Sequence, residues 1–71
     1  MSELSKKQLA GKNLRRLIKE SGRTQQEFAD EFRTDLRNVS RYINEGISKV
    51  DTIQEIAVFL KVDFSEFFLD E

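Results

Sequence analysis

The sequence predicts an all-α fold, a compact domain of five short helices, and three observations support this prediction. The chain of 71 residues has no Pro and only three Gly, so few residues interrupt a helix. Apolar residues recur at helical spacing, and Thr or Asp precedes several of the apolar segments, where it can cap a helix. The connections between segments are short, as in other all-α domains. We treat residues 1–71 as one domain, with a core over about 7–69 and a short N-terminal arm over 1–6.

The first predicted helix runs from about Lys7 to Glu20, with Leu14, Leu17 and Ile18 on one face. Gly22 is expected to end it in a left-handed conformation. A second, short helix follows the segment T-Q-Q-E that begins at Thr24, which has the spacing of a capping box. Its buried face is expected to consist of Phe28, Ala29 and Phe32.

The third predicted helix spans about Leu36 to Asn44 and follows a tight turn, with Thr34 or Asp35 as its N-cap. The fourth begins near Asp51 or Thr52, both of which have capping-box spacing. Its apolar residues give the clearest helical period in the chain: Ile53, Ile56, Ala57 and Leu60. The fifth is a short helix opened by Asp63 and Glu66.

The composition excludes most enzymatic chemistry. Without Cys there is no disulfide or thiolate metal site, and without His the usual general base near neutral pH is missing. We therefore expect no enzyme, no metal and no cofactor. Because so short a chain buries only about 60% of its unfolded surface, we expect support from a second copy of the chain.

No membrane partner is expected, because the longest apolar run, Ile56–Leu60, is far shorter than a membrane span. The first residues also lack the apolar segment of a secretory signal. These features predict a cytoplasmic protein.

Charge is divided unevenly along the chain, although the net charge is only −1. Residues 6–41 contain ten Lys or Arg against five Asp or Glu, a net of +5, whereas residues 42–71 contain two against seven, a net of −5. Such asymmetry indicates a charged partner for one half, and chance segregation on solvated helix faces is the alternative.

The second and third predicted helices, joined by a three-residue turn over Gln25–Gly46, have the spacing of a helix-turn-helix. Ala29 and Val39 are expected at the crossing of these helices. The opposite side of the third helix is then exposed, and its candidate base-reading residues are Leu36, Arg37, Asn38 and Arg41. Arg can bond guanine through two hydrogen bonds and Asn can do so with adenine, so this face suits the major groove of double-stranded DNA.

The sequence resembles the lambda-repressor-like (Xre-type) helix-turn-helix family over roughly Gly11 to Phe68. The segments that carry the resemblance are S-G-R-T-Q-Q-E-F-A, V-S-R-Y and I-Q-E-I-A-V-F-L-K-V-D-F-S-E-F-F. It implies that Gln25 contacts a phosphate, that Leu36, Arg37 and Arg41 enter the groove, and that Asn44 lies near the sugar-phosphate backbone. The full set expected at phosphates or flanking positions is Gln25, Thr24, Asp35, Asn44 and Arg15.

Two departures from the family pattern stand out. Arg33 occupies the turn position where the family usually has Gly, so either the turn differs or Arg33 adopts a left-handed conformation. Ile43 replaces a frequent Glu, and one extra residue precedes Gly46.

Several side chains keep alternative interpretations. Leu36 either contacts a thymine methyl group or covers the start of its own helix. Asp35 is expected as an N-cap, with a cytosine contact as the alternative. The basic residues of the first helix, including Arg15, either neutralise phosphates or are simply solvated.

The C-terminal half holds more Phe residues than so small a unit can bury. Phe64 and Phe67 are expected in the core, whereas Val58, Phe59 and Phe68 form a candidate dimer interface. The resulting hypothesis is a transcriptional regulator that binds a palindromic operator as a homodimer. The alternative is a protein-interaction module or antitoxin that binds a protein partner through the acidic, Phe-rich C-terminal half.

Overall fold

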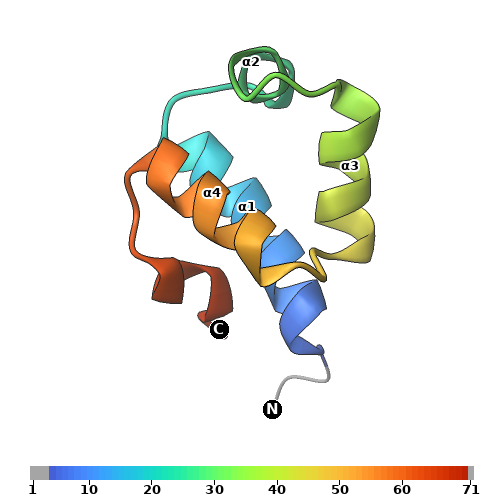
Figure 1. The fold of residues 1–71 in the computed structure, drawn as a ribbon, viewed down its shortest axis with the longest axis vertical. Helices are drawn as coiled ribbons and strands as arrows, with labels where there is room; N and C mark the ends of the chain where they lie inside the picture. The colour runs from blue at the N-terminus through green and yellow to red at the C-terminus, as the bar shows by residue number, and fades with distance from the viewer. Residues whose placement is uncertain (1–3, 71) are drawn as a thin grey trace.

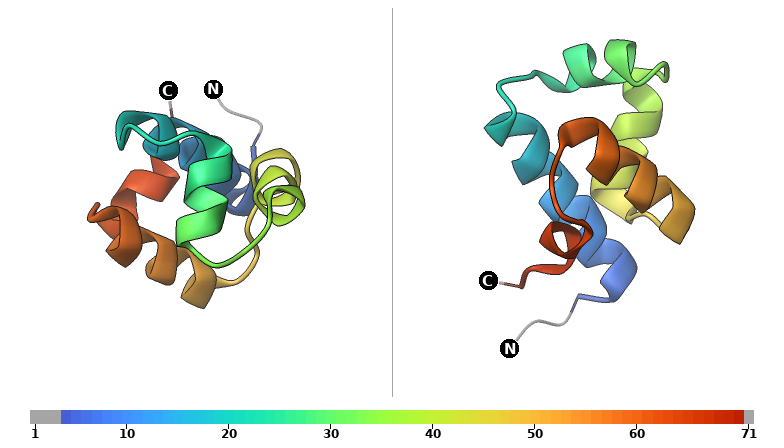
Figure 2. Two further views of the ribbon diagram at one scale, coloured as in Figure 1. Left: turned by 90° about the horizontal axis from the view of Figure 1, so that it is seen from above. Right: turned by 60° about the vertical axis from the view of Figure 1, so that its left-hand side comes forward.

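The computed structural model describes residues 4–70 and confirms the all-α fold. Its helices are α1 (Lys6–Glu20), α2 (Gln25–Glu31), α3 (Leu36–Glu45) and α4 (Val50–Leu60), followed by a 3₁₀ helix, η1 (Phe64–Phe68). Helix α1 is the central element: α4 crosses in front of it, α3 lies to one side and α2 covers one end (Figure 1). Two further views show η1 packed beside the N-terminal half of α1 (Figure 2).

Four of the five predicted helices are α-helices, and the last, short element is a 3₁₀ helix of five residues. Asp63 caps it through the backbone N–H of Ser65, and Glu66 N–H donates to Asp63 O over 3.0 Å. The carbonyl groups of Phe67 and Leu69 then accept hydrogen bonds from Asn13 of α1. Because these carbonyl groups bond to α1, the chain does not continue as an α-helix.

The starts of the helices follow local capping where a capping residue exists. At α2, Thr24 Oγ1 accepts from Glu27 N–H and Glu27 Oε1 accepts from Thr24 N–H, which confirms the predicted capping box. An unpredicted capping box between Ser5 and Gln8 starts α1 one residue before the predicted Lys7. Of the predicted arm over 1–6, residues 1–3 lie outside the described residues, and Ser5 and Lys6 form the cap and first residue of α1.

The predicted caps of α4 are wrong. Helix α4 begins at Val50, with Lys49 as its N-cap and no side-chain capping hydrogen bond. The preceding loop is fixed instead by tertiary contacts, because Ile47 is 2% exposed and its N–H donates to Lys7 O over 3.1 Å. Asp51 lies in the first turn, where its charge favours the helix dipole.

Three helices end in the same hydrogen-bond pattern around one left-handed residue. Gly22 follows α1 as predicted (φ 82°), and Arg33 and Lys61 take the same place after α2 and α4 (φ 61° and 59°). In each case the next N–H reaches back to a helix carbonyl: Arg23 to Ile18, Thr34 to Ala29 and Val62 to Ala57. These Schellman-type ends make each following connection short.

The core lies between α1 and the other elements. Its buried apolar residues are Leu9, Ala10, Leu14, Leu17, Ile18, Phe28, Ala29, Val39, Ile47, Ile53, Ile56, Ala57, Leu60 and Phe67. Gly11 allows α1 and α3 to approach closely, because a Cβ atom there would lie 2.3 Å from Tyr42 O. Phe28, Phe32 and Phe59 join α2 to α4 with ring centroids 5.2–5.7 Å apart.

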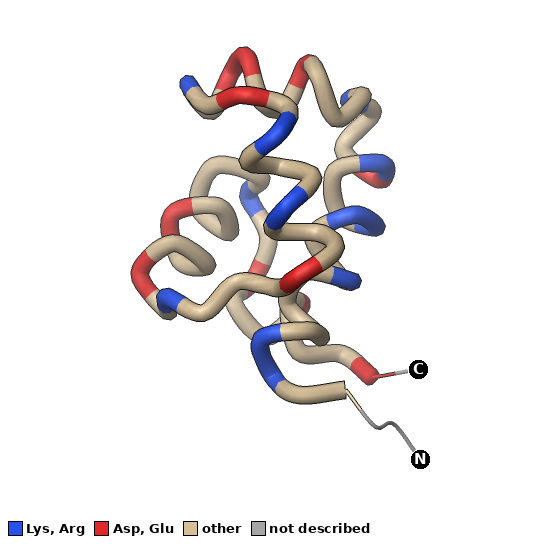
Figure 3. Tube along the Cα trace, turned by 90° about the vertical axis from the view of Figure 1, so that its right-hand side faces the viewer, with Lys and Arg blue, Asp and Glu red and all other residues tan. Residues whose placement is uncertain are grey.

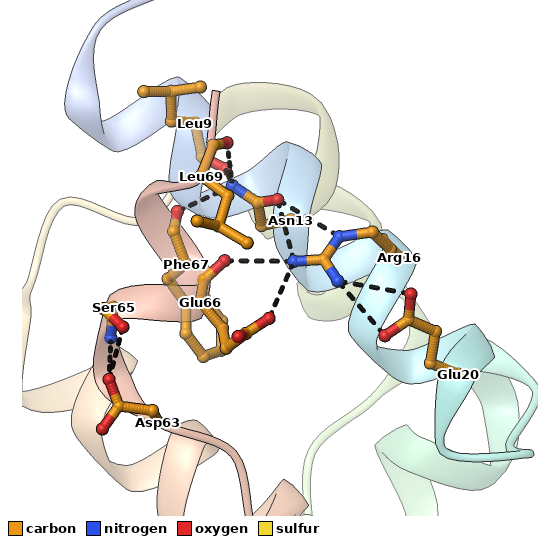
Figure 4. Close-up of polar contacts among 9 residues, drawn as sticks. All are labelled: Leu9, Asn13, Arg16, Glu20, Asp63, Ser65, Glu66, Phe67 and Leu69. Atoms are coloured by element: carbon orange, nitrogen blue, oxygen red, sulfur yellow. Dashed lines mark hydrogen bonds and ion pairs between the residues drawn. The ribbon is translucent and has the colours of Figure 1, made fainter. Parts of the chain in front are cut away.

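Asn13 is a buried polar residue that ties the C-terminal segment to α1 (Figure 4). Its Nδ2 lies 2.9 Å from both Phe67 O and Leu69 O, and 3.0 Å from Leu9 O. Its Oδ1 accepts from Arg16, which also pairs with Glu20 and Glu66. The Ser65 hydroxyl and backbone N–H donate to Asp63, and these hydrogen bonds lower the pKa of that carboxyl.

Candidate nucleic-acid interface

The turn between α2 and α3 determines how α3 is presented. Arg33 occupies the left-handed position, so the turn keeps its shape without Gly there. Thr34 N–H donates to Ala29 O over 2.8 Å, and Asp35 then caps α3 by accepting from Asn38 N–H over 2.7 Å. This resolves the predicted choice of N-cap in favour of Asp35.

Helix α3 has one anchored side and one exposed side. Val39 is fully buried, and Tyr42 and Ile43 pack against the core. On the other side Arg37, Arg41 and Asn44 are exposed, and Leu36 is 42% exposed. The structure therefore places Arg37, Asn38 and Arg41 around one hollow of α3, with Leu36 exposed beside them. Figure 3 shows α3 in front, with basic positions along it.

A shallow hollow of about 280 Å³ lies at the start of this face, lined by Thr34, Asp35, Arg37, Asn38 and Arg41. Within residues 4–70, Arg37 has no side-chain hydrogen bond or ion pair. Asn38, by contrast, bonds both Thr34 and Arg41 through its side chain. Within the described residues, the protein therefore holds the Arg41 side chain by a hydrogen bond, whereas it does not hold the Arg37 side chain in this way.

Three of the five residues expected at phosphates or flanking positions lie together. Arg15, Thr24 and Gln25 line a second hollow together with Ile18, Lys19 and Arg23, where α1 meets the start of α2. The Thr24 hydroxyl is engaged in the capping box, and Gln25, the first residue of α2, is half-buried. Asn44 lies outside this hollow, on the exposed side of α3, 3.5 Å from Ser40 Oγ.

A second group of basic residues contains Lys7, one of the first-helix residues expected either to neutralise phosphates or to be solvated, and Lys49, which the sequence did not single out. A hollow of about 340 Å³ between α3 and α4 is lined by Lys7, Arg41, Tyr42, Glu45, Gly46, Ile47, Ser48, Lys49 and Thr52. Lys7 reaches it because the Ile47 N–H bonds to the Lys7 carbonyl. The one signal for this contact in the sequence is the apolar Ile47 within an otherwise polar loop.

The predicted dimer residues have different environments. Val58 is 77% exposed and lines a hollow on α4 with Asp51, Gln54 and Glu55. Phe59 is half-buried in the aromatic cluster, with the Arg23 guanidinium 5.1 Å from its ring centre. Phe68 is half-buried against Phe64. Of the three, Val58 is thus the exposed residue.

The charges divide across the surface as they divide along the sequence. In Figure 3 basic positions lie on α3 in front and along α1 on the right, whereas α4 on the left carries two acidic positions. Within residues 4–70 no group of three acidic, His or Cys side chains is placed to hold a metal ion, and no helix is long and apolar enough to cross a membrane.

A short helix, a tight turn and an exposed basic helix define a helix-turn-helix protein, a class that binds DNA. The family model described as Helix-turn-helix, HTH_3, matches residues 14–67, so the chain belongs to this Xre/lambda-repressor-like family of non-enzymatic DNA-binding domains. Comparisons with curated proteins and with solved structures gave no match.

Proposed function

We propose that the chain is a sequence-specific transcriptional regulator that binds a palindromic operator as a homodimer, with α3 in the major groove. The observation that supports this proposal is the exposed face of α3. Arg37 and Arg41 lie about one helical turn apart there, on a helix whose other side is anchored by Val39. Arg is the residue most often paired with guanine through two hydrogen bonds. Leu36 supplies an apolar contact for a thymine methyl group.

Basic residues on both flanks of α3 support this orientation. Arg15 and Lys19 line the hollow on one side, and Lys7 and Lys49 line the hollow on the other. A major groove is bordered by two phosphate backbones, so cations on both sides of an inserted helix match the charge of the duplex. Asp35 is an acidic residue on this face, and it caps α3.

The size of the chain supports a dimer. Its longest dimension is 34 Å, and half-sites on a palindromic operator are about 34–36 Å apart from centre to centre. One copy presents one α3 and so covers one half-site. A second copy, related by a two-fold axis, would place its α3 in the next major groove.

The exposed face of α4 is suited to pair with itself. In an antiparallel pair of α4 helices centred on Val58, Glu55 of one copy would lie near Lys61 of the other, the left-handed residue that directly follows α4, because each is three residues from Val58. Both are exposed, and neither has an ion pair within residues 4–70. Phe59 and Phe68 would contribute the exposed parts of their rings beside Val58.

A second candidate function, binding to another protein, is favoured by one observation. Asp51, Gln54, Glu55 and Val58 form an acidic surface with an exposed apolar centre. An acidic surface would repel DNA, so its partner would be a basic protein. This function needs neither Arg37 nor Arg41.

Selection from a pool of random duplexes separates the two functions. We expect enrichment of a two-fold-symmetric sequence with half-sites about ten base pairs apart. Binding to it should weaken steeply between about 50 and 200 mM salt. If no duplex is retained at the lower salt concentration, the proposed function is wrong and the protein-binding candidate remains.

A further inference from the structure

We propose that Asn38 is a positioning residue that fixes the direction of Arg41 on the DNA-facing side of α3. This inference rests on the proposed DNA-binding function and adds a residue that determines its specificity. The observation behind it is a chain of three side chains, Thr34, Asn38 and Arg41, which starts in the turn before α3 and runs along its exposed face.

The hydrogen bonds in this chain have one consistent arrangement. Arg41 Nη2 donates to Asn38 Oδ1 over 2.6 Å, and Asn38 Nδ2 donates to Thr34 Oγ1 over 2.9 Å. A guanidinium has donors but no acceptor, so the Asn38 oxygen must face Arg41. The Asn38 amide nitrogen must then face Thr34, whose hydroxyl can accept.

The chain starts from a fixed point. Thr34 is half-buried, and its N–H is bonded to Ala29 O in α2 over 2.8 Å. The backbone N–H of Asn38 is itself held by the cap, Asp35, over 2.7 Å. The fixed turn therefore holds the Asn38 side chain in place, and Asn38 in turn holds the Arg41 guanidinium.

This arrangement gives Asn38 and Arg41 different roles in reading DNA. The amide oxygen and nitrogen of Asn38 are both bonded within the protein, so pairing with adenine would break these bonds. Arg41 uses one nitrogen on Asn38 and keeps its other donors for a base. A side chain already held in place loses less conformational freedom on binding. Arg37, which has no such partner within residues 4–70, is an internal control.

The first experiment measures side-chain order in the free protein by ¹⁵N relaxation of the Arg Nε–Hε groups. We expect Arg41 to be more ordered than Arg37. Asn38→Leu, which has a similar size and no hydrogen bonds, should lower the order of Arg41 to that of Arg37 and leave Arg37 unchanged. Asn38→Asp keeps an acceptor for Arg41, with Thr34 now donating, and should preserve the order. Equal order of the two Arg side chains in the wild type would overturn the proposal.

The second experiment measures base preference on duplexes that differ from the selected operator at single base pairs. Asn38→Leu should reduce discrimination by about 3- to 10-fold at the base pair that Arg41→Ala also affects. The double variant should discriminate no worse than Arg41→Ala alone, because Asn38 acts through Arg41. Asn38→Asp should keep the preference while binding all duplexes more weakly, because a carboxylate repels phosphate.

Two other results have distinct meanings. If Asn38→Leu loses discrimination at a different base pair, Asn38 reads a base itself and the proposal is wrong. If the wild type retains no duplex, the proposed function fails. The relaxation measurement then still decides whether Asn38 orders Arg41.

Discussion

At the scale of single residues, the exposed face of α3 has two Arg side chains that differ in their hydrogen bonds within the protein. Arg41 is bonded to Asn38, whereas Arg37 projects from the first turn of α3 with no side-chain partner within residues 4–70. Every hydrogen-bond donor of Arg37 is therefore available to a base. Arg15, which lines the hollow where α1 meets the start of α2, is expected to contact a DNA phosphate and not a base.

This contrast leads to a prediction for matched Arg→Ala variants. Arg37→Ala should lose about 1–3 kcal/mol of discrimination at one base pair of each half-site, since it removes a base contact. Arg15→Ala should weaken binding to all duplexes alike and lower the salt slope by about 1, since it removes a phosphate contact. Competition titrations with single-base-pair variants measure both effects. If Arg37→Ala weakens binding to all duplexes equally, Arg37 contacts the DNA backbone and not a base.

The sequence predicted some of these residues well and others poorly, for a physical reason. The Thr24 capping box and the Asp35 cap bond groups three residues away, so short spacing reveals them. Asn13 bonds the carbonyls of residues 54 and 56 positions away in sequence, and no local pattern encodes such contacts. The Asn38 contacts are local, but their partners could not be chosen before the rotamers were known.

At the scale of elements, helix interiors were predictable from apolar spacing, whereas several helix ends depend on tertiary contacts. The interiors of α1 and α4 match the predicted buried faces at Leu14, Leu17, Ile53 and Ile56. The start of α4 and the 3₁₀ form of η1 follow from contacts with α1, through Lys7 and Asn13. Capping signals alone therefore misplaced the start of α4, and at η1 they located the cap, Asp63, without indicating the 3₁₀ form.

The packing of α1 against α3 provides a stability prediction. Gly11→Ala places a Cβ atom against the backbone oxygens of Tyr42 and Ile43, at 2.3 Å and 3.0 Å, so the two helices must separate. We expect a loss of about 1–3 kcal/mol in the free energy of unfolding, although Ala favours helix formation over Gly by about 1 kcal/mol.

Denaturant titration of Gly11→Ala measures this loss. The exposed Lys19→Ala in the same helix serves as the control and should change stability by no more than about 0.5 kcal/mol. A Gly11→Ala protein as stable as the wild type would show that α1 and α3 are not in such close contact.

At the scale of the whole molecule, the net charge of −1 conceals a basic surface on α1 and α3 and an acidic surface on α4. The basic surface faces DNA in the proposed function, and the acidic surface contains the proposed dimer contact. The charge division was predictable from the sequence. The location of the basic and acidic residues on different sides of the molecule could not be predicted, because it depends on how the helices pack.

The proposed α4 pairing predicts a charge-swap result. Glu55→Lys and Lys61→Glu should each weaken the dimer, because each places like charges opposite one another at both symmetry-related contacts. The double variant should restore dimerisation, since the opposite charges face each other again. Sedimentation equilibrium measures the dissociation constant of each variant. If the double variant dissociates as readily as the single variants, the antiparallel pairing centred on Val58 is wrong.

The central claim is that two copies of α3 read a palindromic operator, and the selection from random duplexes tests it most directly. With wild-type protein, we predict a two-fold-symmetric sequence bound by two chains per duplex, with a salt slope that reflects several phosphate contacts. With Arg37→Ala, the same selection should give a sequence that is relaxed at one base pair of each half-site. Retention of all duplexes equally, or of none at low salt, would contradict the account.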